Sequence, residues 1–343
     1  MTHPVRTALV GFGYAGRTFH APLIAACSGL RLEAVVSRQA EAAADAWPGV
    51  RVMATLDQAL ADPGVELVVL ATPNDLHAAQ AEAALMAGKA VVVDKPFTLT
   101  AAEAGHLAAL AETRGLLLSV FHNRRWDADF LTLQVLLAED RLGPVVRLES
   151  GFNRYRPEVR DRWREGDGPG AGIWYDLGPH LIDQALVLFG RPLGVTCDLA
   201  ILRPGGRATD YAHAVLRYAD KRVVLHADMV TPAPDARFAV HGARASWLKD
   251  GLDVQEAQLQ AGLTPGAAGW GIDPRSGVVV DGATGAREVV AGSPGDYAAY
   301  YAAIARAIRE GAPNPVPPRE AVAVMEVLEA GLLSAERRVE VAL

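Results

Sequence analysis

Residues 7–16 read Thr-Ala-Leu-Val-Gly-Phe-Gly-Tyr-Ala-Gly, an uncharged, β-rich run followed directly by the pattern Gly-x-Gly-x-x-Gly. Glycines allow a tight turn and let the backbone approach a ligand closely. A helix that opens at such a turn offers its N–H groups and the positive end of its dipole to a pyrophosphate. A glycine-rich structural turn is the alternative, but the placement between a strand and a helix favours a dinucleotide site. The residues expected to contact the dinucleotide are Gly11, Phe12, Gly13, Tyr14 and Gly16.

The sequence around this turn alternates β-rich runs with alanine-rich helical stretches, as in a parallel sheet covered by helices. The predicted strands are mostly uncharged, as expected of strands buried on both faces, and span residues 7–10, 32–37, 66–71, 90–93 and 116–120. Helices are predicted over residues 76–87 and 101–113, the second with Thr100 and Glu103 as a capping box. The first 122 residues are therefore predicted to form a doubly wound α/β Rossmann domain.

The alternation stops after residue 122, and residues 123–343 are predicted to form a second, α+β domain. A helix is expected over 128–138 and a strand over 145–152. Several β-rich runs separated only by turns lie between residues 195 and 240, which favours an antiparallel or mixed sheet. Two closing helices are predicted over 296–310 and 319–337. The first of them carries a stripe expected to face the core, formed by Tyr297, Tyr300, Tyr301, Ile304 and Ile308.

Composition excludes several classes of protein. The chain has 343 residues, of which 50% are hydrophobic and 21% charged, and this fits a two-domain globular protein. Its formal net charge of -7 disfavours a nucleic-acid binder, because phosphates are neutralised by clustered positive charge. Cys27 and Cys197 lie far apart without metal-ligand spacing, so neither a metal nor a disulfide framework is expected. Neither a secretory signal nor a membrane-spanning run is apparent, which predicts a cytoplasmic protein.

The end of the second predicted strand bears on the choice of nucleotide. An NAD site usually carries an acidic residue there, whose carboxylate binds the ribose hydroxyls. This chain instead reads Val35-Val36-Ser37-Arg38. Ser37 can donate a hydrogen bond to a 2′-phosphate, and the Arg38 guanidinium can pair with that phosphate or stack on the adenine. We therefore expect NADP rather than NAD, with a solvated Arg38 at a strand end as the alternative.

Polar residues also follow the third and fourth predicted strands. One strand leads into Thr72-Pro73-Asn74, with His77 close behind, and the other leads into Asp94-Lys95-Pro96. Ligands of doubly wound folds collect at these carboxyl ends. The proline keeps Lys95 out of helical geometry, so its ammonium could project toward a substrate oxygen. A solvated surface lysine is the alternative, because lysines are rarely buried.

A second chemical cluster lies in residues 170–183, which read Gly-Ala-Gly-Ile-Trp-Tyr-Asp-Leu-Gly-Pro-His-Leu-Ile-Asp. If Pro179 lies in the first turn of the following helix, Asp176 and His180 can reach the same face of that turn. A neutral imidazole can take a hydroxyl proton, and a nearby carboxylate can orient it. Two alternatives are a structural Asp–His pair and a cation held by Asp176, His180 and Asp183, for which no fourth ligand is evident.

Together these segments resemble the Gfo/Idh/MocA family of NAD(P)-dependent oxidoreductases over essentially the whole chain. The glycine turn, the Thr-Pro-Asn segment with His77, the Lys95-Pro96 segment and the Asp176–His180 segment occur in the family's order. Three further segments resemble bacterial NADP-dependent scyllo-inositol dehydrogenases, namely residues 18–24, 121–127 and 160–165. The resemblance implies a Rossmann domain and a second domain with an open mixed sheet, whose exposed face joins copies into a homodimer or homotetramer.

The resemblance also implies roles for individual residues. The family's lysine falls on Lys95, and its aspartate and histidine fall on Asp176 and His180, so these three are the expected catalytic residues. The family's usual glutamate before that lysine is Asp94 here, which keeps the charge and shortens the side chain. The implied cofactor contacts are Gly11, Gly13, Gly16, Thr72, Pro73, Asn74 and His77, together with Asp94, Lys95 and, more loosely, Asn123 and Trp163.

The expected reaction is hydride transfer between NADP(H) and a secondary alcohol or ketone of a polyol or sugar, with scyllo-inositol and its inosose as candidates. His180 would remove the hydroxyl proton, Asp176 would orient the imidazole, and Lys95 would stabilise alkoxide charge. The alternatives are a non-catalytic sensor of NADP or a sugar, and a reductase for another carbonyl such as a keto-sugar or dihydrodiol. An arginine-rich run could clamp an anionic substrate, although neighbouring acidic residues offset its charge; it comprises Arg154, Arg156, Arg160, Arg162 and Arg164.

Overall fold

The computed structural model describes residues 3–233 and 236–343. The chain folds into two compact units. The first combines the chain up to Trp126 with Gln255–Trp270 and Asp296–Val322, and the second comprises Asp127–Val254, Gly271–Gly295 and Ala323–Leu343. The sequence predicted one continuous second domain over residues 123–343, whereas the chain returns to the first unit twice. Such returns need contacts between residues far apart in sequence, which local patterns do not reveal.

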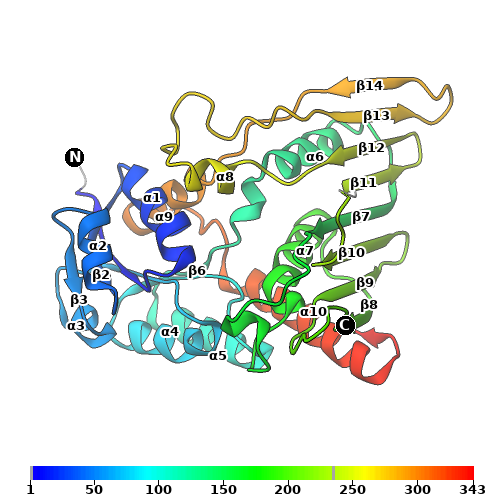
Figure 1. The fold of residues 1–343 in the computed structure, drawn as a ribbon. Coiled ribbons are helices and arrows are strands. Elements are labelled where there is room, and N and C mark those ends of the chain that lie inside the picture. The colour runs from blue at the N-terminus through cyan, green and yellow to red at the C-terminus, as the bar shows by residue number, and fades with distance from the viewer. Residues whose placement is uncertain (1–2, 234–235) are drawn as a thin grey trace. The chain divides into compact units, whose positions relative to one another are not determined.

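The first unit is built on a six-stranded parallel sheet with the strand order β3-β2-β1-β4-β5-β6 (Figure 1). The predicted doubly wound Rossmann fold is thereby confirmed. Its strands are β1 (Val5–Val10), β2 (Leu30–Val36), β3 (Arg51–Met53), β4 (Leu67–Leu70), β5 (Ala90–Val93) and β6 (Leu118–Val120). The edge strand β3 was not predicted, because it has three residues, none of them buried, and lacks the apolar run of a central strand.

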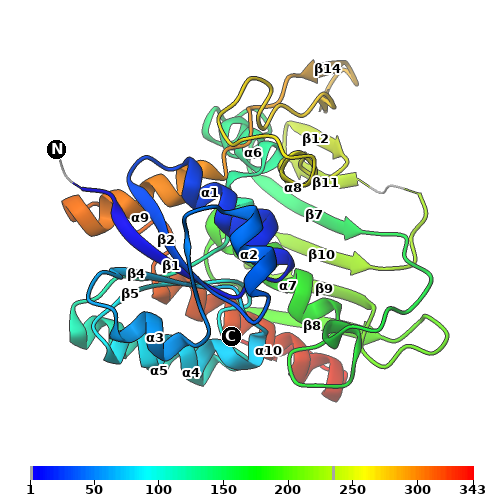
Figure 2. The ribbon, with the colours of Figure 1, turned by 60° about the vertical axis from the view of Figure 1, so that its left-hand side comes forward.

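Helices cover both faces of this sheet. Figure 2 shows α1 and α9 on one face and α4 and α5 on the other. The helices of the unit are α1 (Ala21–Ala26), α2 (Ala40–Ala46), α3 (Leu56–Ala61), α4 (His77–Met86), α5 (Ala101–Arg114), α8 (Gln255–Gln260) and α9 (Ala298–Glu310). The predicted capping box at the start of α5 is present, with Glu103 N donating to Thr100 Oγ1 at 3.2 Å and Thr100 N donating to Glu103 Oε2 at 3.0 Å.

The aromatic stripe of α9 explains why residues 296–322 belong to the first unit. Tyr297, Tyr300 and Tyr301 are fully buried, which confirms the predicted core-facing stripe. The hydroxyl of Tyr300 donates to Ser119 Oγ in β6 at 2.9 Å, and so a buried polar group finds its partner within the sheet. Apolar area removed from water at these three rings holds α9 against the Rossmann core.

The second unit contains a nine-stranded sheet with the order β14-β13-β12-β11-β7-β10-β9-β8-β15. The pair β7–β10 is parallel and every other neighbouring pair is antiparallel, so the predicted mixed sheet is confirmed. Its strands are β7 (Val145–Asn153), β8 (Gly194–Ala200), β9 (Tyr211–Arg217), β10 (Arg222–Asp228), β11 (Ala236–Gly242), β12 (Ala245–Asp250), β13 (Gly277–Asp281), β14 (Arg287–Val290) and β15 (Val341–Ala342).

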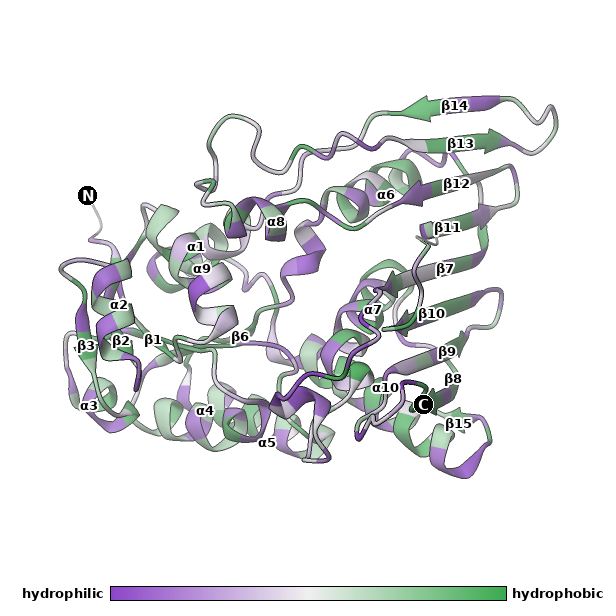
Figure 3. Cartoon of the chain, viewed as in Figure 1, coloured by the Kyte–Doolittle hydropathy of each residue, from purple (hydrophilic) through white to green (hydrophobic). Residues whose placement is uncertain are grey.

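Helices α6 (Ala128–Ala138), α7 (Ile173–Phe189) and α10 (Pro318–Arg337) lie along one face of this second sheet (Figure 1). Strand β9 shows the consequence, because Ala212, Ala214 and Leu216 are buried while His213 and Val215 between them are half-buried. The indole N–H of Trp174 in α7 donates to the carbonyl of Leu328 in α10 at 3.0 Å. Figure 3 shows hydrophobic residues along the strands of both sheets, where the two cores lie.

Candidate functional site

The carboxyl ends of all six Rossmann strands lie in register. In each neighbouring pair the last residues face each other across the sheet, in the order Met53, Val36, Val10, Leu70, Val93 and Val120. The next N–H groups continue the ladder, since Ala71 N donates to Val10 O and Asp94 N to Leu70 O, both at 2.8 Å. The segments singled out in the sequence therefore leave the sheet along one edge, where ligands of this architecture bind.

The three glycines of the turn after β1 differ in what a side chain at each position would contact. A Cβ on Gly11, whose φ is +97°, would lie 2.4 Å from the carbonyl oxygen of Ala71, and a Cβ on Gly16 would lie 2.1 Å from that of Gly11. Both positions therefore need glycine for the chain itself to pack. A Cβ on Gly13 would meet nothing within 4 Å. The turn thus leaves an open space at Gly13, which fits the close approach of a pyrophosphate.

A helical segment starts directly after Gly13. Its π-helical turn η1 (Gly16–His20) continues into α1, and Arg17 N donates to Gly13 O at 3.0 Å. N–H groups in the first turn of a helix have no carbonyl partner within the helix, and the helix dipole adds partial positive charge there. Backbone N–H groups and open space therefore coincide at this turn, as an anionic ligand requires.

The end of β2 places Ser37 and Arg38 beside this turn, because Gly11 N donates to Val36 O at 3.0 Å. Ser37 N donates to Met53 O at 3.1 Å, and Ser37 Oγ accepts from Gln39 N at 2.9 Å. The side chain of Arg38 is exposed. A hydroxyl and a guanidinium therefore follow the strand that neighbours β1.

His77 ties together the segments that follow β4 and β5. Its ring is buried, with Nδ1 2.8 Å from Pro96 O and Nε2 3.0 Å from Thr72 O. The Thr72 hydroxyl also donates to Gln80 Oε1 at 2.7 Å. The predicted cofactor residue His77 thus bridges two backbone segments and fixes their spacing. In the same segment Asn74 is buried and Pro73 is exposed.

Asp94 lies within a buried polar chain that the sequence did not reveal. His20 Nε2 is 3.7 Å from Asp94 Oδ2, which is too long for a hydrogen bond, while His20 Nδ1 is 2.6 Å from the Tyr301 hydroxyl. Burial by itself raises the pKa of Asp94. The neighbouring His20 and the charges of Lys95 and His77 outweigh burial and lower the pKa to about 2. An ionised carboxylate therefore lies directly before Lys95, whose own side chain is half-buried.

Asn123 follows β6 at the same edge of the sheet. It opens the short helix η3 (Asn123–Trp126) and is buried. Of the residues predicted to contact a dinucleotide, those from Gly11 to Asn123 thus belong to this unit and follow its strand ends, whereas Trp163 belongs to the second unit.

In the second unit, helix α7 carries Asp176 and His180 one turn apart. The sequence-based condition that Pro179 lies in the first turn is not met, because the helix begins at Ile173 and Pro179 lies inside it. The early start depends on Gly172, whose φ is +91° and whose added Cβ would lie 2.4 Å from Thr209 Oγ1. Asp176 is consequently in the first turn, and His180 is buried with 5% of its surface exposed.

Two arginines of the cationic run face Asp176. Arg154 Nη1 and Arg164 Nε each lie 3.8 Å from an oxygen of its carboxylate. The Arg164 guanidinium also sits over the ring of Trp163, 4.8 Å from its centroid, and Trp163 is 40% exposed. Sequence alone could not choose among the five arginines; the structure places these two beside the predicted catalytic carboxylate.

Arg162 of this run joins a largely buried ion-pair network that also contains Glu165, Arg203 and Asp210. Arg162 Nε donates to Glu165 Oε1 at 2.6 Å, and Arg203 pairs with Glu165 at 3.0 Å and with Asp210 at 2.9 Å. Burial raises the pKa of Glu165, but hydrogen bonds from Arg160 N and Arg162 outweigh burial and lower it. Glu165 thus offsets part of the positive charge of the arginine-rich run, as expected. Arg203 also donates to the carbonyls of Arg156 and Glu158 and so holds the loop that precedes Trp163.

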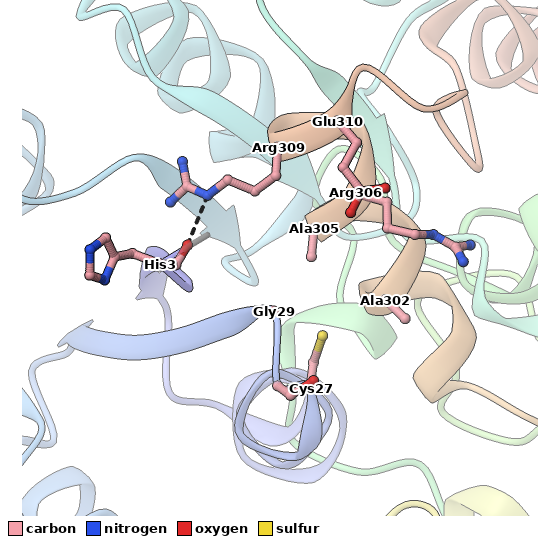
Figure 4. Close-up of a pocket in the computed structure, with 9 residues that line it drawn as sticks. His3, Cys27, Gly29, Ala302, Ala305, Arg306, Arg309 and Glu310 are labelled. Atoms are coloured by element: carbon pink, nitrogen blue, oxygen red, sulfur yellow. Dashed lines mark hydrogen bonds between the residues drawn. The ribbon is translucent and has the colours of Figure 1, made fainter. Parts of the chain in front are cut away.

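A separate cavity of about 290 Å³ lies in the first unit (Figure 4). It is lined by His3, which precedes β1, and by Gly29, which precedes β2, so it lies at the amino ends of the strands. Its Arg309 is paired with Glu66 at 2.8 and 2.9 Å, and burial raises the pKa of the Cys27 thiol. The cavity thus lies at the opposite ends of the strands from the residues that are predicted to bind the cofactor.

Within residues 3–233 and 236–343, no group of three or more His, Cys, Asp or Glu side chains is arranged to hold a metal ion. No helix in the same ranges has both the length and the apolar character needed to cross a membrane.

Comparisons with known proteins agree with this architecture. A family model described as "Oxidoreductase family, NAD-binding Rossmann fold" matches residues 5–122, and one described as "Oxidoreductase family, C-terminal alpha/beta domain" matches residues 135–343. The oxidoreductase YdgJ of Escherichia coli (strain K12) is 52% identical over 341 residues, 98% of either chain. The protein IolW of Bacillus subtilis (strain 168), a scyllo-inositol 2-dehydrogenase (NADP(+)), is 37% identical over 97% of this chain and 94% of its own.

Among solved structures, the oxidoreductase YPO2259 from Yersinia pestis is 49% identical and superposes with a TM-score of 0.96, covering 100% of this chain and 98% of that one. The two family models together span most of the chain and cover both the six-stranded and the nine-stranded sheet. The chain is therefore an oxidoreductase of the Gfo/Idh/MocA family, with an NAD(P)-binding Rossmann domain in its amino-terminal part.

Proposed function

We propose that this oxidoreductase transfers a hydride between NADP(H) and a secondary alcohol or ketone of a polyol or sugar. The observation that carries the proposal is the edge of the first sheet, where six strand ends in register meet an open space at Gly13. The nicotinamide accepts or donates the hydride at its C4 atom when the cofactor is bound. Self-association through the second sheet, as the family resemblance implies, is part of the same proposal.

The residues at this edge fit an NADP molecule. Gly13 and the following N–H groups would receive the pyrophosphate, and Ser37 and Arg38 would bind the 2′-phosphate of the adenosine ribose. The absence of an acidic residue at the end of β2 removes the usual partner of an NAD ribose. IolW, a relative named as NADP-dependent, supports the same preference.

The reacting group of the substrate would be handled by three side chains. His180 would remove the hydroxyl proton during oxidation, and Asp176 would orient that imidazole and bind a neighbouring hydroxyl. Lys95 would stabilise the developing alkoxide charge with its ammonium, and the ionised Asp94 lies directly before it in the chain. Arg154 and Arg164 would hold the Asp176 carboxylate in place.

The substrate class is proposed to be polyhydroxylated. Three hydrogen-bonding side chains that act together on one carbon, as proposed, would suit a ring that carries hydroxyls on adjacent carbons, as inositols and sugars do. A relative that is 37% identical is named as a scyllo-inositol dehydrogenase, which makes scyllo-inositol the first candidate to test.

The proposed reaction can be tested with His180→Ala against a panel of inositols, inososes, aldoses and keto-sugars, followed by NADPH absorbance. We expect the wild type to turn over at least one compound and His180→Ala to lose roughly 10²- to 10⁴-fold in kcat, because a positioned acid–base group contributes this much. NADPH binding should persist in the variant. The matched control is His106→Ala, an exposed histidine of α5. Binding of NADPH without turnover of any panel member by the wild type would indicate a sensor instead.

The nucleotide preference can be tested with Arg38→Ala. Removing the guanidinium should weaken NADPH binding about tenfold and leave NADH binding almost unchanged, because a charge-assisted hydrogen bond to the 2′-phosphate is lost. Titration by nucleotide fluorescence measures both dissociation constants. Arg31→Ala, which removes an exposed arginine within β2, serves as the control. Equal losses for the two nucleotides would contradict the assignment of Arg38 to the phosphate.

The charge state of Asp94 predicts a pH dependence of stability. Its folded-state pKa of about 2 lies below the ordinary value of 3.8, so the ionised form stabilises the fold above that ordinary value and the contribution disappears as the pH falls toward 2. Asp94→Asn should therefore lower the free energy of unfolding at pH 7 by on the order of 2 kcal/mol. Urea unfolding at several pH values should show this difference shrinking below pH 4. A difference in unfolding free energy that stays constant down to pH 2 would contradict this prediction. The control is Asp45→Asn, at an exposed position.

A further inference from the structure

Helix α8 brings two polar side chains from the second half of the chain to the glycine turn. Glu256 and Gln260 are four residues apart and therefore lie on the same face of this helix. The Tyr14 hydroxyl donates to Glu256 Oε1 at 2.6 Å and accepts from Gln260 Nε2 at 2.5 Å. Tyr14 lies between Gly13 and Gly16 in the sequence. Its two hydrogen bonds therefore connect α8 to the turn that is proposed to bind the pyrophosphate.

The second oxygen of the same carboxylate reaches another strand end. Arg124 Nη2 donates to Glu256 Oε2 at 3.1 Å, and the Arg124 side chain is only 6% exposed. Arg124 lies in η3 next to Asn123, directly after β6. A buried guanidinium requires a charged or strongly polar partner, and Glu256 supplies one. One carboxylate thus connects the turn after the central strand β1 with the turn after the edge strand β6.

Helix α8 is itself held in a fixed place. Gln255 is fully buried, its Oε1 accepts from Tyr297 N at 2.7 Å, and its Nε2 donates to Trp126 O at 3.0 Å. Further along, Gln258 Nε2 donates to Gly269 O at 2.8 Å. These bonds secure the helix on both sides of Glu256. The carboxylate therefore acts from a rigid support, as precise positioning of another residue demands.

We propose that Glu256 is a positioning residue for the dinucleotide site, acting through Tyr14 and Arg124 on the two turns that would border the cofactor. The inference rests on the proposed NADP site, which it extends to a residue outside positions 5–122 of the Rossmann family model. Glu256 would not contact the reacting atoms. Its effect would appear in the affinity for the nucleotide, because a loosened turn must be ordered again each time the nucleotide binds.

Two variants weaken this contact from its two ends. Glu256→Gln removes the charge that pairs with Arg124 and leaves the Tyr14 hydroxyl a neutral amide oxygen, which is a weaker acceptor than a carboxylate. Tyr14→Phe removes a single hydroxyl from the turn and leaves its ring, which lies edge-on to Phe19 at 6.1 Å. If both residues act through one contact, the effects of the two substitutions should not add.

The experiment titrates the full-length protein with NADPH by nucleotide fluorescence for the wild type, Glu256→Gln, Tyr14→Phe and the double variant. We expect each single variant to bind NADPH about three- to thirtyfold more weakly, and the double variant to bind no more weakly than about the worse single variant. The kcat of Glu256→Gln at saturating NADPH should stay within about twofold of the wild type, because Glu256 would not contact the reacting atoms. The control is Glu288→Gln, which removes an exposed pair with Arg141 in the second unit.

Two outcomes would overturn the inference. One is NADPH affinity within twofold of the wild type for both single variants. The other is additive losses in the double variant, which would mean that the residues act independently. Should Glu256→Gln fold poorly, Tyr14→Phe against the control still decides, because Tyr14 is 46% exposed and the substitution deletes only its hydroxyl. Failure of the wild type itself to bind NADPH or NADH would instead refute the proposed function.

Discussion

The close approach of backbone to backbone at the carboxyl end of β1 is the constraint on which the site depends. A Cβ on Gly11 would lie 2.4 Å from the carbonyl oxygen of Ala71, and a Cβ on Gly16 would lie 2.1 Å from that of Gly11, so no larger residue fits at either position. This contact sets the turn directly against the end of β4. With the strand ends in register, it also brings the turns after β4 and β5 to the same edge. Close packing of the backbone at Gly11 and Gly16 shapes a turn in which the space beside Gly13 stays open.

The polar residues at this edge of the sheet interact with one another and with the backbone. His77 bridges two backbone segments, and the ionised Asp94 lies between His20 and Lys95. Such a network fixes the charge of the site before any substrate arrives, which is how a protein lowers the reorganisation needed during a reaction. In the second unit the same logic applies to Asp176, whose carboxylate is flanked by two guanidinium groups.

Sequence patterns predicted the elements with strong local signals and missed those defined by distant contacts. Strands β4 and β5 are short apolar runs, and α5 has a capping box, so composition and spacing located them. His20 and Glu256 carried no such signal, because their partners lie 74 to 281 and 132 to 242 residues away. The start of α7 at Ile173 also depends on a distant residue, because Gly172 at positive φ packs against Thr209 and directly precedes the helix.

The most direct test of the account is the affinity of Gly13→Ala for NADPH, measured together with its melting temperature. The backbone φ of Gly13 is not positive and its added methyl group meets nothing, so the fold should accept alanine without loss of stability. The account predicts an unchanged melting temperature and at least a tenfold loss of NADPH affinity, because the methyl group fills the space assigned to the pyrophosphate. Wild-type affinity in a folded Gly13→Ala protein would contradict it.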